Sequence, residues 1–120
     1  MATLTPTFTL TSSDVSSDVL SITTTDTLTV TGATTNISRK SIATGSAQAV
    51  LASNSSFSYV YLKVVSSTDA AAWVQVLLGG DSKMKIRVGE FAFIPLYSSQ
   101  AITAEAQTAA CVLEFGAWTA

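Results

Sequence analysis

The chain has 120 residues, of which only 12% are charged, and its formal net charge is −2. This acidic balance argues against a general nucleic-acid binder, whose phosphate contacts need a basic surface. Histidine is absent and Cys111 is the only cysteine, which excludes an intrachain disulfide, histidine-based catalysis and a cysteine-pair zinc site.

The charged fraction is about half of the usual value of about 25%, and Thr, Ser and Ala dominate instead. A polar but nearly uncharged surface loses little desolvation energy when another protein covers it. The composition therefore favours a subunit that stays in contact with neighbours. The alternative is a free extracellular β-domain with a Ser/Thr-rich face.

Neither a membrane span nor a secretory leader is visible. No apolar run approaches the roughly 18 to 20 residues of a membrane helix. The first 20 residues lack the positive start and the apolar centre of a signal peptide. We therefore expect synthesis in the cytoplasm and no membrane partner.

The N-terminal segment alternates with a period of two, which is typical of a strand with one set of side chains on each face. Leu, Pro or Phe occupies its even positions from 4 to 10, and threonine occupies the odd positions Thr3, Thr5, Thr7, Thr9 and Thr11. Because Pro6 cannot donate a ladder hydrogen bond, we expect an edge strand or an extended arm. Such an arm could pair with a neighbouring subunit, so its candidate interface residues are Thr3, Thr5, Thr7 and Thr9.

Alternation further along the chain predicts more short strands. They are expected around residues 20–22 and 28–30, and then at 37–44, 47–53, 57–65, 72–78, 84–88, 91–96, 101–107 and 110–115, with a tail at 116–120. Strands at this spacing, without a convincing helix, are typical of a β-sandwich or barrel. We predict an all-β, antiparallel β-sandwich as a single domain over residues 1–120, with residues 1–35 as an extended arm or appended strands.

The most defined charged feature is the row Lys83, Lys85 and Arg87, whose spacing of two predicts one shared strand face. Three like charges repel one another unless an acidic surface, a phosphate or a neighbouring subunit's carboxylates neutralise them. The row is therefore a candidate interface. The alternative is a solvated edge strand that its lysines protect from aggregation.

Aromatic residues offer a second candidate surface, for stacking sugars or binding protein: Trp73, Trp118, Tyr59, Tyr61 and Tyr97. We expect Trp73 to fill the core. Trp118, near the end of the sequence given, has less reason to be buried and is a candidate interface anchor. Cys111 lies in an apolar segment and is expected to be a small core hydrophobe.

Two carboxylates on late strands, Glu105 and Glu114, would share a sheet face if their strands paired, as a glycosidase acid and nucleophile must. The alternative is that both face solvent or pair with Lys or Arg. Residues 79–83 lack the spacing of a phosphate loop and predict a hairpin turn.

Three aspartates precede the first basic residue: Asp14, Asp18 and Asp26. A calcium loop needs closely spaced acids and a glycine that allows the turn, and neither is present between Asp14 and Asp18. We expect loop-forming aspartates. The sequence thus predicts no enzyme activity, no cofactor and no metal.

Five segments share a strand, turn, strand rhythm: Tyr59–Lys63, Val74–Asp81, Val88–Leu96, Ile102–Ala106 and Leu113–Gly116. In these segments, which span about half of the chain, it resembles small virion proteins of tailed bacteriophages. The resemblance implies a jelly-roll-like sandwich, often trimeric, that serves as a capsid cement (decoration) protein or as a tail or fibre component.

From this resemblance we expect a homo-oligomeric, trimeric cement subunit that is made in the bacterial host cytoplasm and resides in the virion. It would bridge neighbouring copies of the phage major capsid protein or contact another virion protein. The alternative is a tail or fibre module that binds a host surface glycan or a tail partner.

Overall fold

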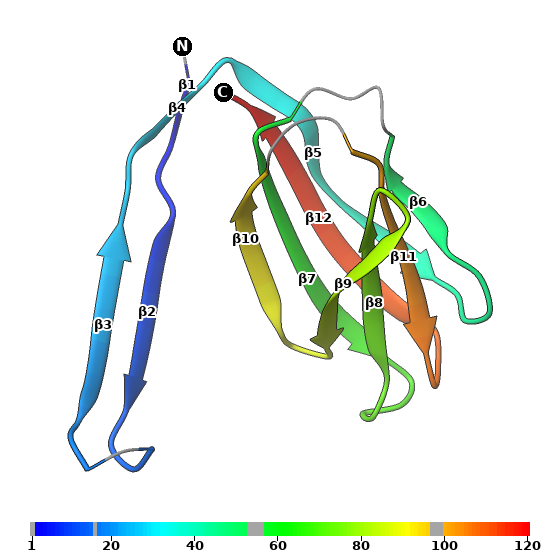
Figure 1. The fold of residues 1–120 in the computed structure, drawn as a ribbon, viewed down its shortest axis with the longest axis horizontal. Helices are drawn as coiled ribbons and strands as arrows, with labels where there is room; N and C mark the ends of the chain where they lie inside the picture. Colours follow the sequence, from blue (N-terminus) through cyan, green and yellow to red (C-terminus); the bar gives the residue numbers. More distant parts are fainter. Residues whose placement is uncertain (1, 16, 53–56, 97–99) are drawn as a thin grey trace. The chain divides into compact units, whose positions relative to one another are not determined.

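The computed structural model describes residues 2–15, 17–52, 57–96 and 100–120 of the chain. Within these residues it contains twelve β-strands and no helix (Figure 1). The chain divides into two compact units, residues 1–32 and residues 33–119. The prediction of an all-β chain is confirmed. A single domain with residues 1–35 as an arm or appended strands stays a prediction.

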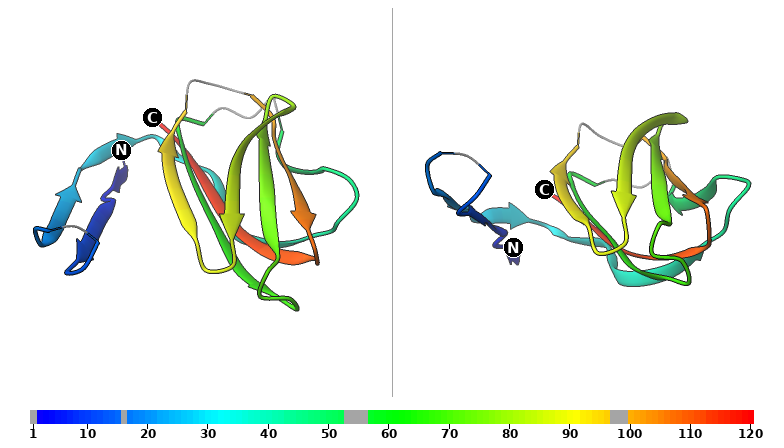
Figure 2. Two further views of the ribbon diagram at one scale, coloured as in Figure 1. Left: turned by 60° about the horizontal axis from the view of Figure 1, so that its bottom comes forward. Right: turned by 90° about the horizontal axis from the view of Figure 1, so that it is seen from below.

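The larger unit is sandwich-like and consists of two four-stranded sheets packed together (Figure 2). The first sheet has the order β10-β7-β12-β5, formed by Phe91–Pro95, Tyr59–Ser67, Cys111–Thr119 and Gly32–Ile42. The second sheet has the order β6-β11-β8-β9, formed by Gln48–Leu51, Ile102–Gln107, Trp73–Leu78 and Asp81–Arg87. Strand β7 pairs antiparallel with β10 and β12, and β8 pairs antiparallel with β9 and β11.

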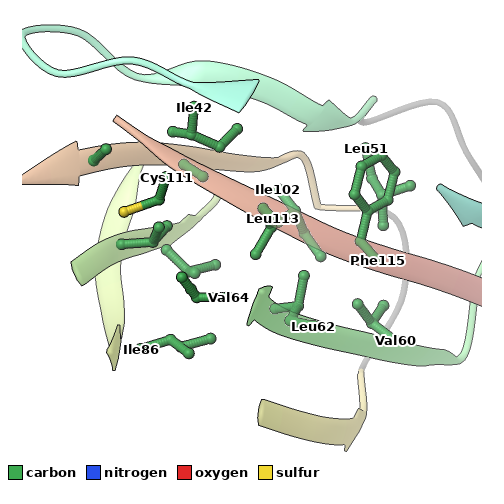
Figure 3. Packing of buried hydrophobic residues seen from close by; sticks show 14 of the residues in the cluster. Ile42, Leu51, Val60, Leu62, Val64, Ile86, Ile102, Cys111, Leu113 and Phe115 are labelled. Carbon is green, nitrogen blue, oxygen red and sulfur yellow. The ribbon is translucent and has the colours of Figure 1, made fainter. Parts of the chain in front are cut away.

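The core lies between these two sheets and follows from strict alternation. In β7 the side chains of Val60, Leu62 and Val64 are fully buried, and their neighbours at 59, 61 and 63 are not. The facing sheet contributes buried residues such as Ile86 and Ile102 (Figure 3). Each fully buried aliphatic side chain contributes about 1.5 to 3 kcal/mol through removal from water. Burial of apolar side chains at every second position therefore drives the two sheets together.

Cys111 belongs to this core, as predicted from its apolar segment. Its side chain is 1% exposed, its thiol is free, and Figure 3 shows it among the aliphatic residues. A buried thiol of this kind acts as a small hydrophobe rather than as a nucleophile.

The turn between β8 and β9 confirms the expected hairpin. Leu78 pairs with Asp81, so Gly79 and Gly80 form a two-residue loop. Their φ values are 60° and 89°, and the tight hairpin turn that matches strand twist requires positive φ at both positions. Only glycine adopts such φ values without strain.

The N-terminal unit is a hairpin whose strands are β1 (Ala2–Leu4), β2 (Thr7–Ser12), β3 (Leu20–Thr25) and β4 (Leu28–Val30). Strand β1 pairs antiparallel with β4, and β2 pairs antiparallel with β3. Both pairs keep one register, since Thr3 lies opposite Thr29 and Thr9 lies opposite Thr23. A break at Thr5–Pro6 separates β1 from β2, as expected for a proline that cannot donate to the ladder.

Because side chains alternate across a strand, this register gives the hairpin two unlike faces. We call them the threonine face, formed by Thr3, Thr7, Thr9, Thr11, Ser21, Thr23, Thr25 and Thr29, and the apolar face, formed by Leu4, Phe8, Leu10, Leu20, Ile22 and Leu28. The apolar face also includes Thr24 opposite Phe8 and Ser12 opposite Leu20. The hydroxyls of Thr7 and Thr25 lie 3.2 Å apart across the strands. The alternation predicted for residues 3–11 is therefore confirmed, and its partner is the segment 20–30.

Two predictions, one about the tail that contains Trp118 and one about Trp73, are wrong. Residues 116–119 are not a tail, because β12 continues to Thr119 with Trp118 opposite Tyr59. Trp73 does not fill the core, because Val74 and Val76 take the inward positions of β8 and alternation places Trp73 on the outer face. Tyr97 lies outside the described residues.

Candidate protein-binding surface

The outer face of the first sheet carries a group of aromatic side chains. Since Val60, Leu62 and Val64 of β7 point inward, the side chains at 59, 61 and 63 point outward. The register then forms three cross-strand rows: Pro95–Tyr59–Trp118, Phe93–Tyr61–Gly116 and Phe91–Lys63–Glu114. We call the group formed by Tyr59, Tyr61, Phe91, Phe93 and Trp118 the aromatic face.

Three of these rings contact one another. The rings of Tyr59 and Phe93 are stacked, with centroids 6.0 Å apart and planes 9° apart. Phe93 and Trp118 have centroids 6.3 Å apart at a tilt of 43°. Aromatic pairs at such distances contribute about 0.5 to 1.5 kcal/mol beyond their buried area. These mutual contacts hold the three rings in fixed positions on the sheet.

Gly116 makes room at the centre of this surface. A Cβ atom there would lie 2.7 Å from Ile37 Cδ1 and 3.2 Å from Trp118 Cη2. Glycine here provides side-chain space and does not serve an unusual φ, since Gly116 is not among the positive-φ residues. Its missing side chain lets Ile37 and Trp118 lie flat across β12.

An ion pair borders the aromatic face. Arg39 Nε donates to Glu114 Oε2 at 2.9 Å, and the Tyr61 hydroxyl donates to Glu114 Oε1 at 2.9 Å. These hydrogen bonds, from Tyr61 first and then Arg39, hold the pKa of Glu114 below its usual value, and the charge of Lys63 adds a smaller contribution. Partial burial, followed by the bond to Glu114, raises the pKa of Tyr61. The carboxylate is thus already satisfied within the subunit.

Much apolar area on this surface remains open to solvent. Phe91 is 62% exposed and Ile37 is 53% exposed. Phe91 lies on β10 and Ile37 on β5, the two edge strands of this sheet, and the half-buried rings of Tyr59, Tyr61 and Trp118 lie on the strands between them. Single exposed hydrophobics are ordinary, whereas larger apolar patches are typical of interaction sites. Tyr, Trp and Phe are enriched at the centres of protein interfaces. The face is suited to binding, and it holds no nucleophile and base pair.

The outer face of the second sheet is different, because it is polar. The Nζ atom of Lys85 lies 4.4 Å from the ring centroid of Trp73, a cation–π contact. Gln75 hydrogen-bonds Ser82, and Gln107 donates to Glu105 Oε1 at 3.1 Å. The two outer faces therefore differ in character, one mainly aromatic and the other mainly polar.

The predicted cation row lies on β9, which is the edge strand of the second sheet in the described structure. Lys85 and Arg87 lie opposite Gln75 and Trp73, and Arg87 also pairs with Glu90 at 3.3 Å. The register shifts so that Ser82 and Met84 have cross-strand partners and Lys83 has none. The bulge lies at the start of the row, and exposure still alternates from Lys83 to Arg87, with Met84 and Ile86 less exposed than the three cations. The row stays a prediction as an interface, and its place on an edge strand fits the protective alternative.

The remaining interface candidates fall into separate units. Trp118 joins the aromatic face, whereas Thr3, Thr7 and Thr9 lie on the threonine face of the hairpin. Thr5 lies at the break between β1 and β2. A shallow hollow near the hairpin tip is lined by residues 11–13 and 19–21, none of them ionisable.

The hypothesis that Glu105 and Glu114 share a sheet face, as a glycosidase acid and nucleophile must, is wrong. Glu105 lies on β11 in the second sheet, and Glu114 lies on β12 in the first sheet. Both are on outward positions, because Ala104, Ala106 and Leu113 next to them are buried. The two carboxylates therefore face away from each other across the sandwich. Late strands that are adjacent in sequence entered different sheets, which spacing alone does not reveal.

The aspartates do not gather around a metal position. In the described part of the chain no group of three or more acidic or cysteine side chains is placed to hold a metal ion. Asp14 accepts a hydrogen bond from the Ser12 hydroxyl, and Asp26 accepts one from the Thr27 amide. Both are local turn interactions.

Sequence reasoning missed Phe91, Phe93, Ile37 and Arg39 as members of the surface. The spacing of Phe91 and Phe93 was a usable signal, because it puts two rings on one face of β10 while Ile94 faces inward. No sequence signal pointed to Arg39, whose Glu114 partner lies 75 residues away.

Comparison of the chain with protein-family models, curated proteins and solved structures finds no match. A search of the described residues for a helix that could span a membrane finds none.

Proposed function

We propose that this protein is a structural subunit of a tailed-bacteriophage virion, a capsid cement protein that oligomerises and bridges neighbouring copies of the major capsid protein. The observation that carries the proposal is the aromatic face on the first sheet. It provides rigid rings on a packed scaffold, and its neighbouring carboxylate is already paired within the subunit.

The physical advantage of this face is low ordering cost. Tyr, Phe and Trp side chains have few rotatable bonds, and here Phe93 contacts Tyr59 and Trp118 before any partner arrives. Each contact with the capsid can be weak, since many symmetric copies on one particle add by avidity. A cement role therefore needs only a modest surface on each subunit.

The strand order supports a jelly roll, the architecture implied by the phage resemblance. Numbered from β5 to β12, the first sheet contains strands one, eight, three and six of the eight. The second sheet contains strands two, seven, four and five. This interleaving of two four-stranded sheets is consistent with the proposed jelly roll, a double-sheet fold common in viral capsid domains.

A binding role rather than catalysis is supported by where the titratable groups lie. The sequence has no histidine, and Cys111 is buried in the core. Glu114 is occupied by Arg39 and Tyr61, and Glu105 lies in the other sheet. None of these described groups forms a nucleophile with a base beside it.

The test adds purified protein to capsids assembled from the major capsid protein of the same phage. Co-sedimentation measures the bound copies, and calorimetry measures the heat tolerance of the capsid. Trp118→Ala removes a ring from the aromatic face, and Trp73→Ala is the matched control on the opposite face. We expect Trp118→Ala to weaken binding at least tenfold and Trp73→Ala to leave it unchanged. Equal binding by both variants would exclude the aromatic face as the docking surface.

A second candidate function is a tail or fibre module that binds a host surface glycan. The stacked rings of Tyr59 and Phe93 favour it, because flat aromatic surfaces also bind the apolar faces of sugars. Glycan-array binding by the purified protein, lost in Trp118→Ala, together with no capsid affinity, would select this function over the cement role.

A further inference from the structure

The apolar face of the N-terminal hairpin remains largely exposed. Phe8 is 47% exposed, Leu10 is 44% exposed and Ile22 is 43% exposed. In the described part of the chain, β1, β2, β3 and β4 form only two-stranded sheets. An isolated two-stranded hairpin is marginally stable in water, and additional strands or a packed face are needed. The hairpin by itself therefore lacks the additional strands or the packed face that would stabilise it.

The hairpin also has two edges with backbone groups directed outward. The Pro6 carbonyl accepts a hydrogen bond from the Asp26 amide at 3.2 Å, which makes residues 6 and 26 a hydrogen-bonded pair. Such pairs alternate along an antiparallel ladder, so odd-numbered pairs such as Thr9 and Thr23 turn their N–H and C=O groups away from each other. The short distance between the Thr7 and Thr25 hydroxyls agrees, because side chains approach more closely in non-hydrogen-bonded pairs.

In the described part of the hairpin the edges of β2 and β3 carry no charged side chain, and the missing amide of Pro6 faces Asp26 rather than the outer edge. Proteins usually protect an edge with charged side chains or bulges. Strands β1 to β4 contain no charged residue, because Asp26 lies in the break between β3 and β4 and Asp14 and Asp18 lie between β2 and β3. The registers of both strand pairs contain no shift. Two identical uncharged edges can meet without like-charge repulsion, and neither edge offers a charge that would recognise a charged partner. This neutrality favours a second copy of the chain over a partner of different chemistry.

We propose that the hairpins of neighbouring copies pair edge to edge, β2 of one copy against β3 of the next, and close into a ring of strands around a symmetry axis. Strands β2 and β3 run in opposite directions, so hairpins that point the same way form an antiparallel ring. The apolar face turns inward and the threonine face turns outward. Three copies supply six strands, and closure of a head-to-tail contact leaves no free edge.

The division of side chains between the two faces fits this ring. Phe8, Leu10 and Ile22 are adjacent in the register, since Leu10 lies opposite Ile22. Inside a ring these side chains contact the same residues of the neighbouring copies and are removed from water. The threonines are β-branched and polar, which suits the solvated outer side of a sheet. The inference rests on the homo-oligomer part of the proposed function, and it does not require that the partner is a capsid.

The experiment measures the mass of the purified full chain by light scattering and native mass spectrometry. Ile22→Lys places a charge inside the ring, and Thr23→Lys is the matched control on the next position and the opposite face. Thr9→Pro removes an outward amide without removing a bond inside the hairpin, and Thr9→Ala is its control. We expect Ile22→Lys and Thr9→Pro to lower the mass threefold, to that of a monomer, and both controls to stay oligomeric.

Other outcomes decide against the ring. A monomeric wild-type chain, or an oligomeric Ile22→Lys variant, would overturn it. A Thr9→Pro oligomer beside an Ile22→Lys monomer would refute edge pairing in favour of packed faces. Tryptophan fluorescence and the unfolding midpoint check that the sandwich stays folded in each variant. If the oligomer behaves as described but the protein binds no capsid, the cement function fails and the ring stands.

Discussion

Gly116→Ala is expected to displace Ile37 and Trp118 on the aromatic face with little change in the free energy of unfolding. The new Cβ atom would lie 2.7 Å from Ile37 Cδ1 and 3.2 Å from Trp118 Cη2, which is closer than carbon atoms pack. The first of these atoms is the end of a flexible side chain that is 53% exposed, so it can move outward into water. Trp118 must shift by a few tenths of an ångström.

The magnitude follows from two opposed effects. Replacing glycine by alanine at an ordinary φ stabilises by about 0.4 to 1 kcal/mol, because the unfolded chain loses freedom. Moving the Ile37 methyl away from β12 loses burial of about one carbon, or about 0.8 kcal/mol. We therefore expect the free energy of unfolding to stay within about 1 kcal/mol of the parent. The rings, in contrast, change position.

The assay uses a Trp73→Phe background, in which Trp118 is the sole tryptophan. Guanidinium unfolding gives the stability, and near-ultraviolet circular dichroism and fluorescence report the surroundings of Trp118. Gly32→Ala is the control, because a Cβ there meets nothing within 4 Å. We expect Gly116→Ala alone to shift the Trp118 emission. An unchanged spectrum, or a loss of more than about 3 kcal/mol, would refute the account of Gly116.

Three further results are expected from the sandwich. Leu62→Ala, at a fully buried position, should lower the free energy of unfolding by about 3 kcal/mol in a denaturant titration; a loss below about 1 kcal/mol would contradict its place in the core. Because the folded state holds the pKa of Glu114 below 4.5, its contribution is present above pH 4.5 and is lost as pH falls through the folded pKa. The stability advantage of wild type over Glu114→Gln should therefore shrink in acid, and a pH-independent difference would count against the Tyr61 and Arg39 bonds. Cys111 should react with a thiol reagent only at the rate of unfolding, whereas fast labelling of the native protein would show that it is accessible.

Local pattern was enough to predict the strands, because polar and apolar residues alternate along the hairpin and buried residues alternate along β7, β8 and β11. The period of two at residues 3–11 and 59–65 matches β2 and β7 in the structure. The turn at Gly79–Gly80 was also predictable from local sequence, because two successive glycines can adopt the positive φ that a tight hairpin turn requires. The bulge between Ser82 and Met84 in β9 has no such local signal, although the alternation from Lys83 to Arg87 continues.

The aromatic face could not be predicted in the same way, because it depends on which strands are neighbours. Tyr59 and Trp118 meet only when β12 pairs with β7, and Phe93 joins them only through β10. Trp73 has the same local pattern as a core residue, yet the opposite parity in β8 puts it outside. Long-range register decides these contacts, and spacing along a single strand does not contain it.

The nearly uncharged hairpin has a consequence for how assembly should respond to conditions. All six basic residues of the chain lie beyond residue 38, and the paired hairpin strands hold no charged residue, since Asp14, Asp18 and Asp26 lie between them. An association built on such strands should be almost indifferent to salt screening and to pH between about 5 and 9. Its strength should instead follow temperature, weakening on cooling as apolar burial does, and increasing in sulfate. A subunit of this kind would assemble alike in dilute fresh water and in concentrated brine.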